Sequence, residues 1–370
     1  MKTTNLVSEP TAKKQKRFSQ LPGACLLAAL LIIQPGGLLL AQDTHFSQFD
    51  MSPLTQNPAQ AGASHELAAF VNYREQWQSV ASPFKTTAAS FDMRLNRKKI
   101  KKGFWAAGIN FYTDKSGDLP LSTTQVNLTA AYHLHLNAQN TLGAGFQGGF
   151  AQQSLGLENI RTGSQYNGSA YDAGLPANET LTNTAHSFAD CGAGLLWTYT
   201  NSTGASQVND NQGLRINLGA AVFHPNRPED SFYADGAQLD IKYVLHGDAL
   251  ICLPAGNLAL VPGFQYMVQG PAQELYAGMM LRYKLKQDSK YTGYQKGAAL
   301  SLGAYYRAGD AIAATMLMEY SNYAIGLSYD VNTSELRSAS ADRGGFEITL
   351  RFLNPNPFLG QKGEGSVPGF

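Results

Sequence analysis

The chain has 370 residues, which is long enough for one large domain or two medium ones. With 28 Lys and Arg against 27 Asp and Glu, the net charge of +1 gives no electrostatic reason to expect a nucleic-acid partner. Only 15% of the residues are charged, while Gly (37), Tyr (18) and Phe (18) are plentiful. This composition excludes a disordered chain or a coiled coil and favours many strands and turns.

Residues 1–41 have the features of a secretory signal peptide. A basic stretch over 13–17 precedes an apolar run over 21–33, and Ala41 provides a small-residue cleavage site. A Pro-Gly-Gly sequence interrupts the apolar residues, which argues against a single membrane-spanning helix. Cleavage after Ala41 leaves Cys191 and Cys252, too few for a disulfide scaffold, and we expect them to be packing residues.

Apolar and polar residues alternate with period two through most of the mature chain. In 124–137, Val126 and Leu128 share one face of a strand, and Asn127 and Thr129 share the other. Fourteen segments show this pattern and are predicted to be strands. They are 66–76, 84–95, 103–113, 120–136, 141–153, 186–200, 213–223, 239–253, 258–270, 273–285, 296–307, 312–319, 322–330 and 344–353.

Two architectures compete for these strands. A soluble sandwich buries its apolar faces, whereas a transmembrane barrel turns them to lipid and lines its lumen with the polar ones. An even strand count closes without an edge, and the polar faces are too rich in Asn, Gln, Arg and Asp for two packed sheets to satisfy. We predict an all-β transmembrane antiparallel barrel over 66–353, followed by a tail over 354–370. With both termini in the periplasm, the long polar connection 154–185 faces outward.

The last predicted strand has the form of an outer-membrane assembly signal. Four apolar residues alternate with polar ones, and the series ends on an aromatic residue. The residues predicted to carry this signal are Phe346, Ile348, Leu350 and Phe352.

A short segment over 42–65 precedes the first strand. Asn57-Pro58 and Ala61-Gly62 break regular structure, so a long strand is not expected here. Its apolar residues nevertheless need burial, which predicts an irregular or helical segment packed against, or plugging, the periplasmic mouth of the barrel; a mobile leader is the alternative. These residues are Phe46, Phe49, Met51 and Leu54.

The same region carries the most distinctive motifs of the chain. The sequence reads DTHFSQF at 43–49, NPAQAG at 57–62 and YREQW at 73–77, with further matches at 326–330 and 345–350. In these motifs the chain resembles the PorP/SprF family of type IX secretion membrane proteins over nearly all of 43–353. The resemblance implies an outer-membrane protein that works with a large secreted cargo carrying a type IX C-terminal sorting domain. It also implies links to periplasmic ring or peptidoglycan-binding secretion components.

No nucleotide, zinc or nucleophile motif stands out in the sequence, so we predict neither an enzyme nor a cofactor. His133 and His135 share a strand face, but no acidic or Cys ligand is tied to them by spacing, so we interpret them as lumen lining. Calcium in the outer loops is conceivable, although lone loop carboxylates are usually solvated. The acidic residues concerned are Asp114, Asp118, Glu229 and Asp230.

Charged residues on the predicted inner face are interpreted as lumen ion pairs. Asp92 is expected to pair with Arg94, and Glu347 with Arg351, rather than to serve acid–base chemistry.

These features bear on three functions. The resemblance favours a component that captures, anchors or assists the surface display of a large adhesin-like partner, in gliding or adhesion. A porin or a transporter of hydrophobic substrates is the alternative, and a hydrolase is disfavoured because no Ser/His/Asp arrangement is visible. Besides the apolar cluster of the N-terminal segment, Tyr166 and Tyr171 in the long loop are the predicted partner-binding residues.

Overall fold

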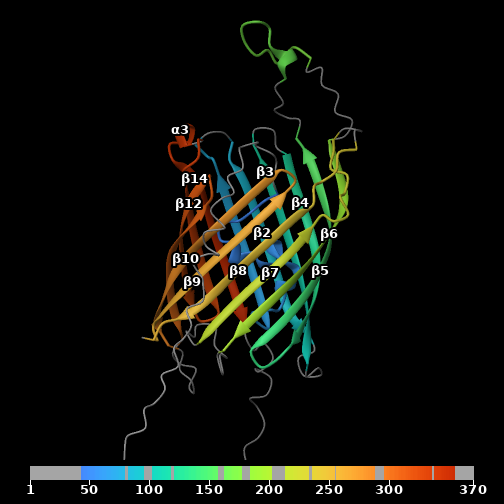
Figure 1. Cartoon of the computed structure of the whole chain (residues 1–370). Helices are drawn as coiled ribbons and strands as arrows, with labels where there is room; N and C mark the ends of the chain where they lie inside the picture. The colour runs from blue at the N-terminus through green and yellow to red at the C-terminus, as the bar shows by residue number, and fades with distance from the viewer. Residues whose placement is uncertain are drawn as a thin grey trace, which may run out of the picture. The chain divides into compact units, whose positions relative to one another are not determined.

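The computed structural model describes residues 43–79, 82–95, 102–117, 121–156, 162–176, 184–201, 213–232, 236–254, 256–287, 296–335 and 337–354 (Figure 1). The predicted signal peptide, Asp118 and the tail from 355 onward lie outside these residues. None of the helices in the described ranges has the length and apolar character needed to span a membrane.

Fourteen antiparallel strands form a closed barrel, as predicted. Each strand pairs with its neighbours in the chain, and β1 pairs with β14 to complete the ring. Every predicted segment matches a strand to within three residues at each end. The strands are β1 (Leu67–Gln76), β2 (Phe84–Leu95), β3 (Gly103–Ser116), β4 (Leu121–His135), β5 (Asn140–Leu155), β6 (Ala185–Thr200), β7 (Leu214–Phe223), β8 (Lys242–Cys252), β9 (Leu258–Gln269), β10 (Ala272–Lys286), β11 (Ala298–Arg307), β12 (Ala311–Tyr320), β13 (Tyr323–Asn332) and β14 (Arg343–Asn354).

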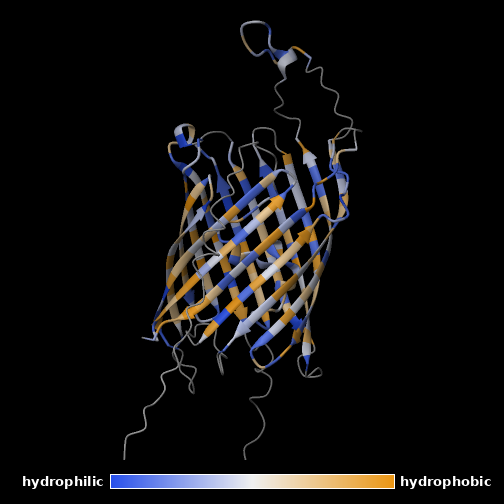
Figure 2. Cartoon of the chain, viewed as in Figure 1, coloured by the Kyte–Doolittle hydropathy of each residue, from blue (hydrophilic) through white to orange (hydrophobic). Residues whose placement is uncertain are grey.

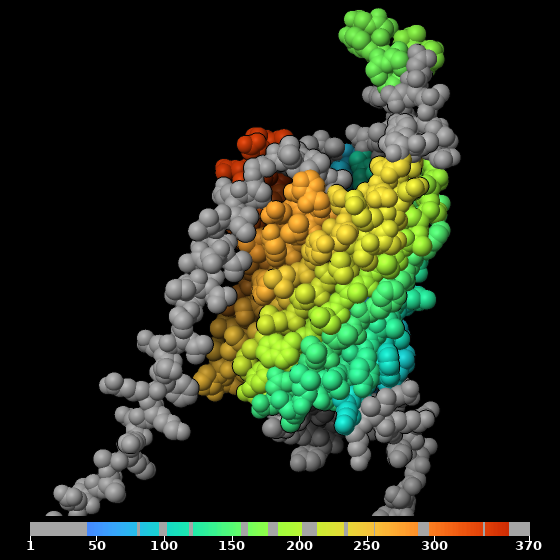
Figure 3. Space-filling view, turned by 45° about the vertical axis from the view of Figure 1, so that its right-hand side comes forward, coloured from blue at the N-terminus to red at the C-terminus, as the bar shows by residue number. Residues whose placement is uncertain are grey.

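Polar side chains face the lumen and apolar ones face outward, as the alternation predicts. Leu128 is 65% exposed, whereas its neighbour Asn127 is 2% exposed. Along the strands the colours of Figure 2 alternate in the same way, and the tilted bands of Figure 3 follow successive strands around the wall. The faces are therefore those of a membrane barrel, since a sandwich would expose the polar residues instead.

The two ends of the barrel differ. We call the end at which β1 begins and β14 finishes the proximal end, and the opposite end the distal end. The two longest connections, 156–184 and 224–241, join strands at the distal end. At the proximal end β4–β5 and β12–β13 turn within a few residues, a difference between ends that is typical of outer-membrane barrels.

Replacing an outward residue at mid-strand by Arg should destabilise the barrel. Leu128 lies at the centre of β4, so Leu128→Arg is expected to cost about 2–4 kcal/mol, because a charge at mid-membrane is poorly solvated. Urea unfolding in lipid vesicles measures this cost. Leu136→Arg is the matched control, since Leu136 is also exposed but follows the last residue of β4, where about 0–1 kcal/mol is expected. Equal costs at both positions would contradict the assignment of the membrane-facing surface.

Candidate functional site in the barrel lumen

The segment ahead of β1 folds into three short helical turns, η1 (Phe49–Met51), α2 (Pro53–Gln56) and η2 (Pro58–Gln60). Pro53 and Pro58 occupy first-turn positions, where a missing N–H costs nothing. The Asn57 side chain caps η2 by accepting a hydrogen bond of 2.8 Å from the N–H of Ala59. Local sequence therefore accounts for the broken, compact path of this segment.

The four apolar residues predicted to need burial lie inside the barrel. Phe46, Phe49, Met51 and Leu54 are each at most 6% exposed. Phe49 meets Tyr276 of β10 and Tyr305 of β11 edge-on, with ring centroids 5.6 Å apart in both cases. We expected the segment to pack against, or plug, the periplasmic mouth; it lies inside the barrel as a plug would, but it extends across the lumen to the distal end, because its apolar side chains find partners along the inner wall. A direct contact between these four residues and a partner stays a prediction.

Asp43 binds the distal end of the wall. Its carboxylate accepts hydrogen bonds from His224 (2.7 Å), which follows β7, and from Gln269 (3.0 Å), the last residue of β9. Lys242, the first residue of β8, lies 3.4 Å away. The other ring nitrogen of His224 is 2.9 Å from Asp190, so the imidazole is held between two carboxylates.

These contacts shift both groups toward their charged forms. Burial alone would lower the pKa of His224, but hydrogen bonds to Asp190 and Asp43 and their negative charges raise it to about 9. Burial also disfavours the Asp43 carboxylate, yet Lys242 and His224 hold its pKa well below the usual range. The distal contact is therefore an ion pair at neutral pH.

The barrel should lose stability as the pH rises from about 6.5 to about 9. A raised folded-state pKa means that protonated His224 stabilises the folded protein fully below the unfolded value near 6.5, and that this contribution disappears through about 9. Asp43, with its lowered pKa, does not titrate in that range. The thermal midpoint measured at intervals across this range should fall, and His224→Gln should flatten the curve. His135→Gln is the control, since His135 is exposed and its ring hydrogen-bonds the Thr141 hydroxyl rather than a carboxylate; an unchanged slope in His224→Gln would contradict the assignment.

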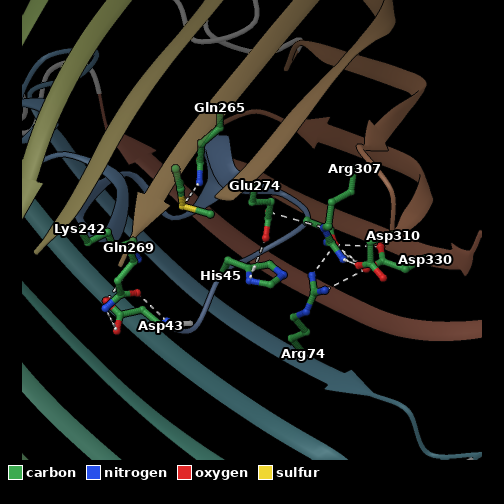
Figure 4. A network of polar contacts seen from close by, with 12 residues as sticks. Asp43, His45, Arg74, Lys242, Gln265, Gln269, Glu274, Arg307, Asp310 and Asp330 are labelled. Atoms are coloured by element: carbon green, nitrogen blue, oxygen red, sulfur yellow. Dashed lines mark hydrogen bonds and ion pairs between the residues drawn. The ribbon is translucent and has the colours of Figure 1, made fainter. Parts of the chain in front are cut away.

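Next along the segment, Ser47 contacts a buried ionic network; Figure 4 shows Arg74, Arg307 and Asp330 of this network. Arg74 of β1 lies 2.9 Å from Asp330 of β13 and 3.1 Å from Glu347 of β14. Arg307 of β11 lies 3.2 Å from the same Asp330 carboxylate. Arg74 and Arg307 both donate to the Ser47 hydroxyl, which donates to Asp330 at 2.8 Å. The network thus joins strands β1, β11, β13 and β14, which lie along one arc of the wall, through one residue of the segment.

Contacts with other strands of the wall hold the middle and the end of the segment. The Asn57 amide donates to the carbonyl of Leu195 in β6 (2.9 Å) and lies 3.0 Å from His246 of β8. Toward the proximal end, the N–H of Gly62 donates to Asp92 (2.7 Å). The segment consequently runs from the distal end, at Asp43, to the proximal end, where it continues into β1.

Two predicted ion pairs are therefore corrected. Arg94 donates to the carbonyls of Gly62 and Ala63, and Asp92 accepts from the Gly62 N–H, so both residues bind the segment. Glu347 pairs with Arg74 rather than with Arg351, because these two residues stand directly opposite each other in the β1–β14 register. Arg351 instead lies 2.6 Å from Glu319.

Glycines on the inner wall make room for the segment. A Cβ at Gly108 would lie 2.8 Å from Leu54 Cδ1, and one at Gly263 would lie 2.9 Å from Phe49 Cζ. At Gly145 a Cβ would collide with the backbone of Pro58 and Ala59. The wall and the segment are thus shaped to each other, as the interior of a packed protein is.

A small cavity of about 40 Å³ lies near the distal end of the segment, between Asp43, Thr44 and Phe46 on one side and Asn110 and Tyr112 on the other. A volume of this size holds a few water molecules and is far below that of a small-molecule pocket. It also faces Asn110, whose amide has no hydrogen-bond partner in the described part of the chain.

The candidate metal ligands are used in other contacts. His133 is buried and its Nε2 lies 2.8 Å from the carbonyl of Ala61, whereas exposed His135 contacts Thr141. Of the carboxylates predicted in outer loops, Asp114 instead lies in β3, because the strand continues past its predicted end, and it accepts from Thr86; Asp230 pairs with His186 at 2.8 Å. Within the described ranges, no group of three or more His, Cys, Asp or Glu side chains could hold a metal ion.

The two tyrosines predicted as partner anchors lie on a small ordered piece of the long loop. Tyr166 and Tyr171 face each other in an antiparallel bridge and are 59% and 42% exposed. The Asn167 side chain accepts hydrogen bonds from the N–H groups of Ser169 and Ala170, which fixes the turn between them. The rings are thus presented on a defined turn, while their contact with a partner stays a prediction.

Several solved structures are similar to this chain. A KdgM porin in complex with disordered oligogalacturonate has 7% identity, with 77% of this chain and 98% of that chain covered and a TM-score of 0.36. A TodX deltaS2S3 mutant monoaromatic hydrocarbon channel has 11% identity, 80% and 92% coverage and a TM-score of 0.44. The translocator domain of autotransporter NalP from Neisseria meningitidis has 11% identity, 82% and 95% coverage and a TM-score of 0.34.

A search of the curated proteins finds no match. The model of a family described as "Type IX secretion system membrane protein PorP/SprF" matches residues 39–352, a range that contains both the lumen segment and all but the last residues of the barrel. The chain, an outer-membrane β-barrel, therefore belongs to the PorP/SprF family of type IX secretion membrane proteins.

Proposed function

We propose that this barrel is a non-enzymatic component of type IX secretion that captures, anchors or assists the surface display of a large secreted partner. The partner proposed is an adhesin-like protein with a C-terminal sorting domain, and the process served is adhesion or gliding. In this role the barrel binds a partner at the membrane and does not serve as a diffusion channel.

The observation that carries the proposal is the N-terminal segment inside the lumen. A diffusion porin needs an aqueous path, but the segment from Asp43 to Gly62 crosses the lumen and hydrogen-bonds to strands on several sides of the wall. Ion pairs fix it at the distal end, and wall glycines fit closely around it. A barrel built in this way supports binding at its ends better than transport through its centre.

In the proposed orientation the proximal end faces the periplasm and the distal end faces the cell surface. The short turns and the chain ends of the strands then lie on the periplasmic side, as in other barrels of this kind. Periplasmic ring or peptidoglycan-binding secretion components would meet the proximal end. The secreted partner would meet the long connections 156–184 and 224–241 at the distal end.

Truncating the long loop should reduce display of the partner and leave the barrel intact. Replacing 160–180 by a short Gly/Ser turn removes both exposed tyrosines, which are the residue type that most often anchors protein interfaces. Surface labelling of the sorting-domain protein in intact cells should fall by about tenfold, the effect of losing one interface anchor. The heat-modifiable barrel band should be unchanged.

Tyr166→Ala with Tyr171→Ala tests the side chains without shortening the loop. Tyr243→Ala is the matched control, because Tyr243 is similarly exposed but lies on strand β8. Unchanged secretion and display in a strain that lacks the barrel, together with large steady conductance of the intact protein, would favour the porin or hydrophobic-substrate transporter instead.

A further inference from the structure

The β1–β14 pair differs from every other strand pair of the barrel. All other neighbouring strands follow one another in the chain, whereas Arg74 of β1 and Glu347 of β14 are 273 residues apart. Because the entropic cost of closing a loop grows with the length of chain between its ends, this pair, here called the seam, is the most costly to form.

The N-terminal segment binds both sides of the seam at one level. Arg74 and Glu347 stand directly opposite each other. The backbone N–H of Ser47 donates to one Glu347 oxygen (2.7 Å), and that of Gln48 donates to the other (3.0 Å). Arg74 donates to the Ser47 hydroxyl, and this hydroxyl also reaches Asp330 on β13. One dipeptide of the segment therefore contacts β1, β13 and β14.

The next inward position of the seam repeats this arrangement. Asn72 and Thr349 are opposite each other, and both are buried. The Asn72 amide donates to the hydroxyl of Thr349 (3.0 Å) and to the carbonyl of Met51 (3.1 Å). Two consecutive cross-strand pairs at the seam are thus completed by backbone groups of the segment.

We propose that the N-terminal segment is a closure clamp that draws the β13–β14 hairpin onto β1 as the barrel closes. The segment is joined directly to β1, so its N–H groups are present at one side of the seam before β14 arrives. A carboxylate that accepts two N–H donors beside an Arg forms hydrogen bonds about twice as strong as neutral ones. This assembly role is independent of the partner capture proposed above, and its test reads barrel closure and not display.

A pair of engineered cysteines reports closure of the seam. Val71 and Leu350 are opposite each other and both face outward, and residues directly opposite in an antiparallel pair lie within disulfide reach. Val71→Cys with Leu350→Cys, in a chain with Cys191→Ala and Cys252→Ala, should cross-link when the full mature chain folds into lipid vesicles. Leu302→Cys with Met316→Cys, opposite each other in β11–β12, reports an ordinary strand pair.

The decisive comparison changes the segment and leaves the strands untouched. Gln48 has a φ of −95° and a side chain without hydrogen-bond partners in the described part of the chain. Gln48→Pro removes the N–H that Glu347 accepts, whereas Gln48→Ala keeps it. We expect Gln48→Pro to slow cross-linking of the seam about tenfold, the effect of losing one charge-assisted hydrogen bond, and Gln48→Ala to leave it unchanged. The β11–β12 reporter should be unaffected in both variants.

Equal slowing of the two reporters would show general destabilisation and would overturn the proposal, as would an unchanged seam rate in Gln48→Pro. If Gln48→Pro gives no folded protein, the seam disulfide is formed first in denaturant and folding is then started. Recovery of the parental yield supports a closure defect, and continued failure with the seam already joined overturns it.

Discussion

Deleting residues 43–62 should open a wide pore in a barrel that we expect not to conduct when it is intact. Barrels of eight strands are filled by their own side chains, and those of sixteen leave an aqueous channel, so a fourteen-stranded barrel without its lumen segment has room for water. The deletion is best made in a chain with the Val71–Leu350 disulfide, which keeps the seam joined. Planar bilayers should show steady porin-like steps for the deletion and no resolved steps for the intact segment.

The parent chain with the same disulfide and an undeleted segment is the control. Porin-like steps from that parent would mean that the segment does not block the lumen in a membrane. Display of the secreted partner should also fall in the deletion if the filled lumen supports the distal binding surface.

Loss of the last strand should abolish assembly. Phe346, Leu350 and Phe352 point outward from β14, and Glu347 and Thr349 point inward, so a chain ending at 342 loses both its apolar assembly pattern and the partner of β1. An open sheet edge in lipid leaves backbone groups unsatisfied at several kcal/mol each. We expect degraded or periplasmic protein and no heat-modifiable band in the outer-membrane fraction.

Two further variants separate the strand from the tail that follows it. Phe352→Ala should reduce the yield of the assembled barrel by removing the terminal aromatic of the pattern. Removing only 357–370 should matter much less, because the tail shows no alternation. A normal yield after loss of the whole strand, or an equal loss from the tail deletion, would contradict the assignment of the signal.

The sequence predicted the barrel well because each strand carries its own signal. Asn127 and Leu128 differ in exposure as their positions in a period-two pattern require. Strand count, strand ends and faces then follow from fourteen repetitions of the same local rule, and the seam follows from the absence of a free edge in lipid.

The lumen site could be predicted only in part. Burial of Phe49 and Leu54 followed from their apolar character, but the partners of the segment lie far away in sequence. His224 meets Asp43 across 181 residues, and no spacing rule connects them. Glu347 pairs with Arg74 because barrel closure sets their register, which a pattern within one strand cannot show. Glycines on the inner face, such as Gly108 and Gly145, were the sequence signal that could have indicated a segment packed inside the barrel. They make room for that segment, whereas a water-filled channel does not require them.

The course of the N-terminal segment has a consequence for the order of export events. The N-terminal segment passes through the ring of strands. It lies beside β8 and β9 at Asp43, at the distal end, and continues into β1 at the proximal end. Wall glycines fit closely around the segment, and a Cβ at Gly145 would collide with the backbone of Pro58 and Ala59; we therefore expect the segment to take its place while the ring is still open. With the distal end facing the cell surface, as proposed, a predicted signal peptide that is still anchored in the inner membrane would keep the start of the segment, at Asp43, on the periplasmic side. We therefore expect cleavage of the predicted signal peptide to precede ring closure, so that a chain resistant to leader peptidase should accumulate as an unclosed periplasmic form.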